Sequence, residues 1–99
     1  MTVKDIMLDS FEIVEKVIDN LPKTFDSHDF IRRFSKEIEV DYVYLLASSG
    51  STEPFQKVNM QIGKFLSNNH AVLGIVSQGK VFSENVFGNN TECEGWSKV

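Results

Sequence analysis

The apolar residues of the first 21 positions recur at helical spacing. When successive residues are placed about 100° apart, one arc of the wheel collects the apolar side chains: Val3, Ile6, Met7, Phe11, Ile13, Val14, Val17, Ile18 and Leu21. The opposite side is mostly acidic, with Asp5, Asp9, Glu12, Glu15, Lys16 and Asp19. Pro22 follows, and a proline disfavours helical conformation in the residue before it. Residues 1–22 are therefore predicted to form one amphipathic helix with an acidic outer face.

The length and composition of the chain predict a single domain spanning residues 1–99. Hydrophobic residues make up 41% of the sequence, which is enough for a packed core. Cys93 is the only cysteine, so no intramolecular disulfide can form, and this fits a reducing compartment. Neither a signal-peptide apolar region nor a membrane-spanning run is evident, so a cytoplasmic protein is expected.

Two further helices are predicted before residue 50. Asp26 and Asp29 stand at capping-box spacing, and Phe25 and Phe30 flank them as a hydrophobic staple. These signals predict a helix that begins after Asp26. Residues 39–48 have the β-propensity of a strand, but they follow the previous helix almost without a break signal, so a short helix ending at Ser48 is the preferred interpretation.

Residues 54–69 form the second strongly periodic segment. Pro54 is favourable at a helix start, and five apolar residues fall within about 100° of arc: Phe55, Val58, Ile62, Phe65 and Leu66. The chain has a net charge of −4, yet the stretch from Pro54 to Lys80 contains lysines and no acid. A surface is recognised by its local charge, so this basic island matters more than the total.

The next segment is predicted to form a β-hairpin over residues 72–83. Gly74, Gly79 and Lys80 have the spacing of a phosphate-binding loop, but Val81 stands where that motif needs Ser or Thr. We therefore interpret Gln78-Gly79 as a tight turn between two strands. Residues 88–99 are expected to be a tail in which Trp96 folds back onto the body.

The order of these elements resembles the winged-helix variant of the helix-turn-helix family over roughly residues 26–87. The predicted fold class is mainly α with a C-terminal β-hairpin (α+β), a three- to four-helix bundle plus a wing. The resemblance implies that the helix at 54–69 enters the DNA major groove and that the hairpin at 72–83 contacts the backbone or minor groove. It further implies a DNA-binding transcriptional regulator whose few phosphate contacts require a homodimer.

The residue types on the exposed face of that helix are compatible with DNA contact. Glutamine and asparagine amides bond to adenine edges, methionine contacts the thymine methyl group, and lysines hold phosphates. The predicted DNA-binding residues are Gln56, Lys57, Asn59, Met60, Gln61, Lys64 and Lys80. A soluble helix must also present a polar face, so solubility alone is the competing explanation.

Two other interpretations stay open. In one, the domain is a protein–protein interaction module that uses the acidic first helix to bind a basic partner, without DNA. In the other, the domain is a small one that associates only with further copies of itself. We expect neither an enzyme nor a metal site nor a cofactor, because His28, His70 and Cys93 are far apart in sequence and lack metal-ligand spacing.

Overall fold

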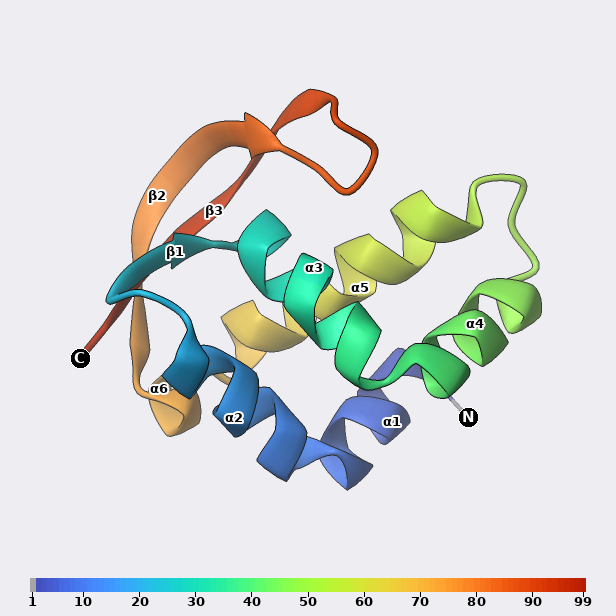
Figure 1. Ribbon diagram of the computed structural model, residues 1–99, viewed down its shortest axis with the longest axis horizontal. Helices are drawn as coiled ribbons and strands as arrows, with labels where there is room; N and C mark the ends of the chain where they lie inside the picture. The colour runs from blue at the N-terminus through green and yellow to red at the C-terminus, as the bar shows by residue number, and fades with distance from the viewer. Residues whose placement is uncertain (1) are drawn as a thin grey trace.

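The computed structural model describes residues 2–99, which form a small α+β fold of helices and one antiparallel sheet (Figure 1). The helices are α1 (Val3–Asp9), α2 (Phe11–Asn20), α3 (Ser27–Glu37), α4 (Glu39–Ser48), α5 (Pro54–Asn68) and α6 (His70–Leu73). The strands are β1 (Thr24–Asp26), β2 (Ile75–Glu84) and β3 (Asn90–Lys98). The predicted α+β class and the helices at 39–48 and 54–69 are confirmed, the latter ending at Asn68.

The prediction of one continuous helix over residues 1–22 is wrong. The chain breaks at Ser10, whose φ of −106° and ψ of 28° lie outside the helical region, and α1 and α2 run in different directions (Figure 1). The break lets α1 pack against α5 while α2 packs against α3. The wheel could not reveal it because both halves keep their apolar residues in the same arc. Acidic side chains still point outward from both helices.

The start of α3 forms as predicted. Asp26 Oδ1 accepts a hydrogen bond from the backbone N–H of Asp29 at 2.9 Å, and Asp29 Oδ2 accepts from the N–H of Asp26 at 3.2 Å. Phe25 and Phe30, the two staple residues, are both buried. Residues 24–26 also form the short strand β1, which has too few residues for sequence periodicity to reveal.

The hairpin predicted at 72–83 is wrong. Val72 and Leu73 belong to α6, which Gly74 ends with a φ of +68°. Strand β2 then continues through Gln78-Gly79 and pairs with β3, so that the sheet has the order β1-β3-β2. Gly79 has a φ of +88° at a β-bulge, where the register shifts. A bulge and a tight turn both favour a glycine with positive φ, so the sequence signal fitted either.

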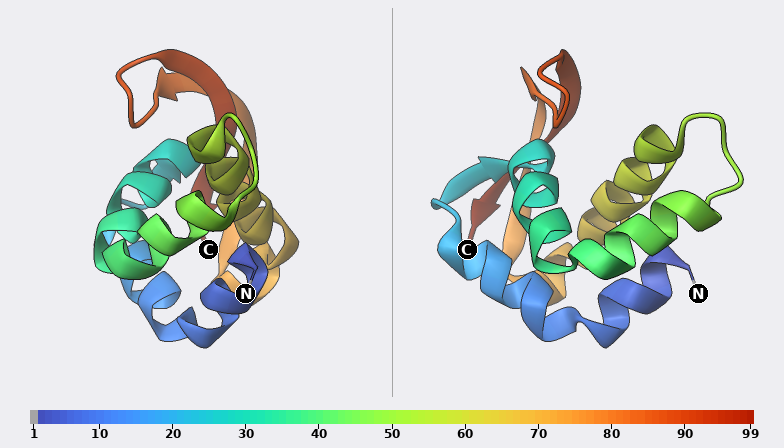
Figure 2. Two further views of the ribbon diagram at one scale, coloured as in Figure 1. Left: turned by 90° about the vertical axis from the view of Figure 1, so that its right-hand side faces the viewer. Right: turned by 45° about the vertical axis from the view of Figure 1, so that its right-hand side comes forward.

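The true hairpin turn lies at residues 85–89, between β2 and β3. Asn85 Oδ1 accepts hydrogen bonds from the N–H groups of Phe87 and Asn89, at 2.9 and 3.1 Å. Arg32 on α3 donates to the carbonyl oxygen of Glu84 at 3.0 Å and holds the end of β2. The hairpin curves so that its tip rises above the helices (Figure 2).

Residues 90–98 of the segment predicted as a tail form β3, the central strand of the sheet. Trp96 on β3 is 1% exposed, which confirms that it folds back onto the body. It joins one core that includes Phe30, Phe34, Ile62 and Leu66 from the helices. Among residues 2–99, no helix has the length and apolar character needed to cross a membrane.

Candidate functional site

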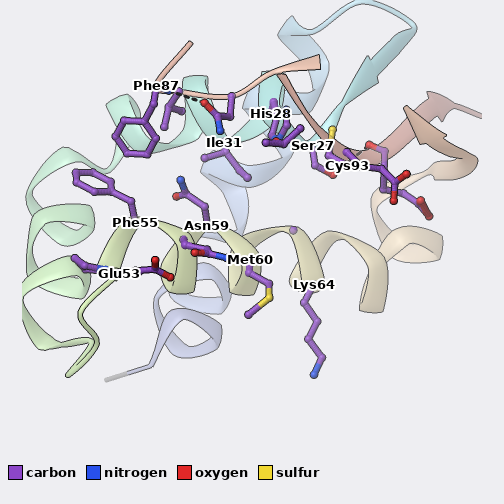
Figure 3. A pocket seen from close by; sticks show the side chains of 18 of the residues that line it. Ser27, His28, Ile31, Glu53, Phe55, Asn59, Met60, Lys64, Phe87 and Cys93 are labelled. Atoms are coloured by element: carbon purple, nitrogen blue, oxygen red, sulfur yellow. Dashed lines mark hydrogen bonds between the residues drawn. The ribbon is translucent and has the colours of Figure 1, made fainter. Parts of the chain in front are cut away.

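A groove of about 1010 Å³ separates α5 from the curved hairpin (Figure 3). Its floor and far wall come from the start of α3 and from β3, including His28, Ile31 and Cys93. Phe55 at the start of α5 meets Phe87 of the hairpin turn edge to face, with ring centroids 4.9 Å apart. This contact closes one end of the groove, and the remainder stays open to solvent along α5.

Five of the seven predicted DNA-binding residues line this groove: Gln56, Asn59, Met60, Lys64 and Lys80. Met60 is 66% exposed, and Gln56 and Lys64 are exposed beside it. Figure 3 shows Lys64 extending from α5 away from the hairpin. Four of the predicted residues that are exposed on α5 define the surface that we call the α5 ridge: Gln56, Met60, Gln61 and Lys64.

Lys57 and Gln61 lie outside the groove. The Nζ of Lys57 donates a 2.7 Å hydrogen bond to the carbonyl oxygen of Ser49, just after the end of α4. Gln61 borders a second depression of about 510 Å³, which Lys4 of α1 and Lys64 also line. Lys4 thus adds a positive charge beside the ridge, which sequence periodicity could not predict because it depends on how α1 packs on α5.

The side chain of Asn59 is held by its own chain. Its Oδ1 accepts a 2.6 Å hydrogen bond from the hydroxyl of Tyr42 on α4. Burial raises the pKa of Tyr42, while the bond to Asn59 opposes that shift. An asparagine must use both its oxygen and its nitrogen to bond an adenine bidentately. Asn59 therefore cannot read a base in this way while the bond to Tyr42 is intact.

Two carboxylates of β3, those of Glu92 and Glu94, face the groove from the side opposite α5, and Glu53 lies just before the start of α5. Glu94 Oε2 lies 3.8 Å from Lys80 Nζ, and its Oε1 accepts a 2.7 Å hydrogen bond from Ser77. Glu53 and Glu92 also line the groove. The charge of Lys80 is consequently offset. Lys64, the other lysine that lines the groove, extends away from the hairpin (Figure 3). Sequence reasoning missed Glu92 and Glu94 because they lie on β3, which was expected to be a tail.

The groove also brings together residues that the sequence keeps far apart. His28 Nδ1 lies 2.7 Å from Ser83 Oγ, and its Nε2 lies 3.3 Å from Thr91 Oγ1. Cys93 Sγ is 3.6 Å from the same serine oxygen. His28 is half-buried and contacts both strands of the hairpin.

No protein-family model, curated protein or solved structure matches this chain.

Proposed function

We propose that this domain binds double-stranded DNA in the manner of a winged helix and serves as a transcriptional regulator. In this proposal the α5 ridge enters the major groove and the β2–β3 hairpin acts as the wing. The observation that carries it is the exposure of the ridge on the long helix before the hairpin, with only the four-residue α6 between them. Gln56, Met60 and Lys64 are all exposed, while the opposite face of α5 is buried in the core.

The sheet supports the same interpretation. Strand β1 joins the hairpin in the order β1-β3-β2, which fixes the hairpin to the start of α3. The wing of the proposal is therefore the hairpin over 75–98, with its tip at 85–89, and no longer the segment 72–83. A rigidly held helix and hairpin are suited to meet a duplex without rearrangement.

The chemistry of the ridge divides into two roles. Gln56 and Gln61 carry amides that can bond base edges, and Met60 presents an apolar surface for a thymine methyl group. Lys64, with Lys4 beside it, supplies charge for phosphates. Lys57 of α5 contributes its charge near the end of α4, because its Nζ donates a hydrogen bond to the carbonyl oxygen of Ser49.

The double variant Lys57→Glu plus Lys64→Glu is expected to bind DNA at least tenfold more weakly than the wild type. Binding to a random duplex should be measured by fluorescence polarisation at low and moderate salt. Each lost phosphate contact reduces the slope of log K against log salt by about 0.9, so the variant should lose roughly 1.8. The matched control is Lys16→Glu plus Lys36→Glu, which makes the same charge change on exposed positions of α2 and α3. Equal affinity of the two double variants would refute the proposed surface.

A protein partner is the second candidate, and the groove carboxylates are the observation that favours it. Glu53, Glu92 and Glu94 repel phosphates, and they would attract lysines or arginines of a basic partner. The acidic residues Asp9, Glu12 and Glu15 are also exposed on α1 and α2. Such a partner would bind less well when acids are neutralised, and changes at Lys57 or Lys64 would have little effect.

A homodimer is part of the DNA proposal, because three or four phosphate contacts per chain give weak binding. Helix α4 offers a surface for the second copy. Val40, Val43 and Tyr44 are exposed at positions that share one helix face. In an antiparallel pair of α4 helices, the first turn of one helix lies beside the last turn of the other. The acidic residues of the first turn, Glu39 and Asp41, would then lie near the Lys57 ammonium group that bonds Ser49 at the end of the second helix. Sedimentation equilibrium should show a dimer, and a monomer that persists at high concentration would contradict this pairing.

A further inference from the structure

We propose that Asp26, His28 and Cys93 bind one Zn²⁺ ion in the wall of the groove. A carboxylate oxygen, an imidazole nitrogen and the thiol sulfur of these residues all lie within 4.8 Å of one another, and all three residues are half-buried. This inference does not depend on DNA binding. It concerns residues on β1, α3 and β3, whereas the α5 ridge lies across the groove.

The fold itself creates this cluster. Asp26 is the last residue of β1 and pairs with Gly95 of β3. Cys93 lies two positions from Gly95, so it shares a face of the sheet with that residue. His28 follows Asp26 within the first turn of α3. A three-residue strand thus brings the start of the helix against a cysteine that is 65 positions away in the sequence.

The ligand types and their separation fit zinc. Zinc binds thiolate at about 2.3 Å and imidazole or carboxylate at about 2.0–2.2 Å, which places tetrahedral ligands roughly 3.5 Å apart. The side chains must therefore close by only about an ångström from the present upper limit of 4.8 Å. A thiolate with an imidazole selects zinc over magnesium or calcium, which prefer oxygen ligands.

Each ligand has a neighbouring group suited to support it. The cap of α3 uses Oδ1 of Asp26, which leaves Oδ2 for the ion. If Nδ1 of His28 binds the ion, its Nε2–H can donate to Thr91 Oγ1, now 3.3 Å away. Ser83 Oγ, released from Nδ1, can then donate to the Cys93 thiolate at 3.6 Å. Groups that hydrogen-bond to metal ligands in this way orient the ligands and increase the affinity for the metal.

Three protein ligands leave a fourth tetrahedral position. His28 and Cys93 both line the groove, so this position faces the space between α5 and the hairpin. A water molecule or an electron-pair donor from a bound partner can fill it. The ion would also link the start of α3 to β3 and stiffen that wall of the groove.

Cobalt titration of the purified chain tests the proposal, because thiolate-bound Co²⁺ gives a charge-transfer band that Zn²⁺ should abolish by displacement. The chain has one cysteine, so a band at one metal per monomer assigns the thiolate to Cys93. We expect Cys93→Ser to remove the band. His28→Gln and Asp26→Asn should each weaken binding by more than the 10- to 100-fold typical of outer-partner changes.

Two controls keep the test specific. Asparagine caps a helix as well as aspartate does, so Asp26→Asn removes a ligand charge without removing the cap. His70→Gln changes the other histidine and should leave the titration unchanged. The absence of a thiolate band would overturn the proposal. So would a band that survives His28→Gln, or one that appears at half a metal per chain, which would mean two cysteines from different molecules.

Discussion

Replacing Trp96 with alanine is expected to lower the free energy of unfolding by about 3–5 kcal/mol. Trp96 is 1% exposed in the central strand, and its Nε1–H donates a 3.1 Å hydrogen bond to Ser27 Oγ. Ser27 is itself buried and donates to the carbonyl oxygen of Glu94 at 3.2 Å. The substitution therefore leaves a large cavity and removes a buried hydrogen bond. The total free energy of unfolding of a domain of this size is about 5–15 kcal/mol, so the variant would lose much of its stability.

Urea unfolding followed by far-UV circular dichroism measures this change, since the variant loses its only tryptophan. Phe82→Ala is the matched control. Phe82 is a large aromatic residue of the same hairpin, yet it is 75% exposed, so its truncation should change stability by less than about 0.5 kcal/mol. Similar losses for the two variants would contradict the placement of β3 at the centre of the sheet.

Neutralising two groove carboxylates, Glu92→Gln plus Glu94→Gln, is expected to strengthen DNA binding by roughly 5- to 10-fold at low salt. The change removes two negative charges facing the α5 ridge and frees Lys80 from its 3.8 Å pair with Glu94. Glutamine at 94 can still accept the hydrogen bond from Ser77. Fluorescence polarisation with a short duplex measures the gain.

The sign of this effect separates the two functional candidates. A basic protein partner that uses the groove would bind the same variant less tightly, because its attracting charges are gone. Glu12→Gln plus Glu15→Gln on α2 is the matched control, with an equal change in net charge on the acidic helices. A gain in DNA affinity from both pairs would reflect net charge alone. A gain from Glu92 and Glu94 only would locate the effect in the groove.

Local signals in the sequence predicted the start of α3, and α4 and α5, well. The capping box at Asp26 and Asp29 formed because both partners lie within four residues, and the break-free segment after it became α4. Pro54 and the apolar arc that follows it likewise positioned α5. In each case the interactions that decide the structure are close in sequence, so one short stretch contains the information.

The sheet required long-range information. Gln78-Gly79 fits a turn or a bulge equally well, and the choice was made by the pairing of β2 with residues 90–98. Strand β1 has three residues and exists because β3 lies beside it. The same pairing hid Glu92, Glu94 and the cluster of His28 and Cys93 from sequence analysis. The hydrogen bond from Tyr42 to Asn59 also depends on how α4 packs on α5. It engages the side chain of Asn59, which the sequence had predicted to contact a DNA base.

The central claim is that the α5 ridge is the surface that meets DNA. A ¹H–¹⁵N correlation spectrum of the labelled protein, recorded during titration with a short duplex at low salt, tests it residue by residue. We predict that the largest shifts occur at Gln56, Met60 and Lys64, with smaller ones in the turn at 85–89. Shifts confined to α1 and α2, or a spectrum that duplex DNA leaves unchanged, would contradict it.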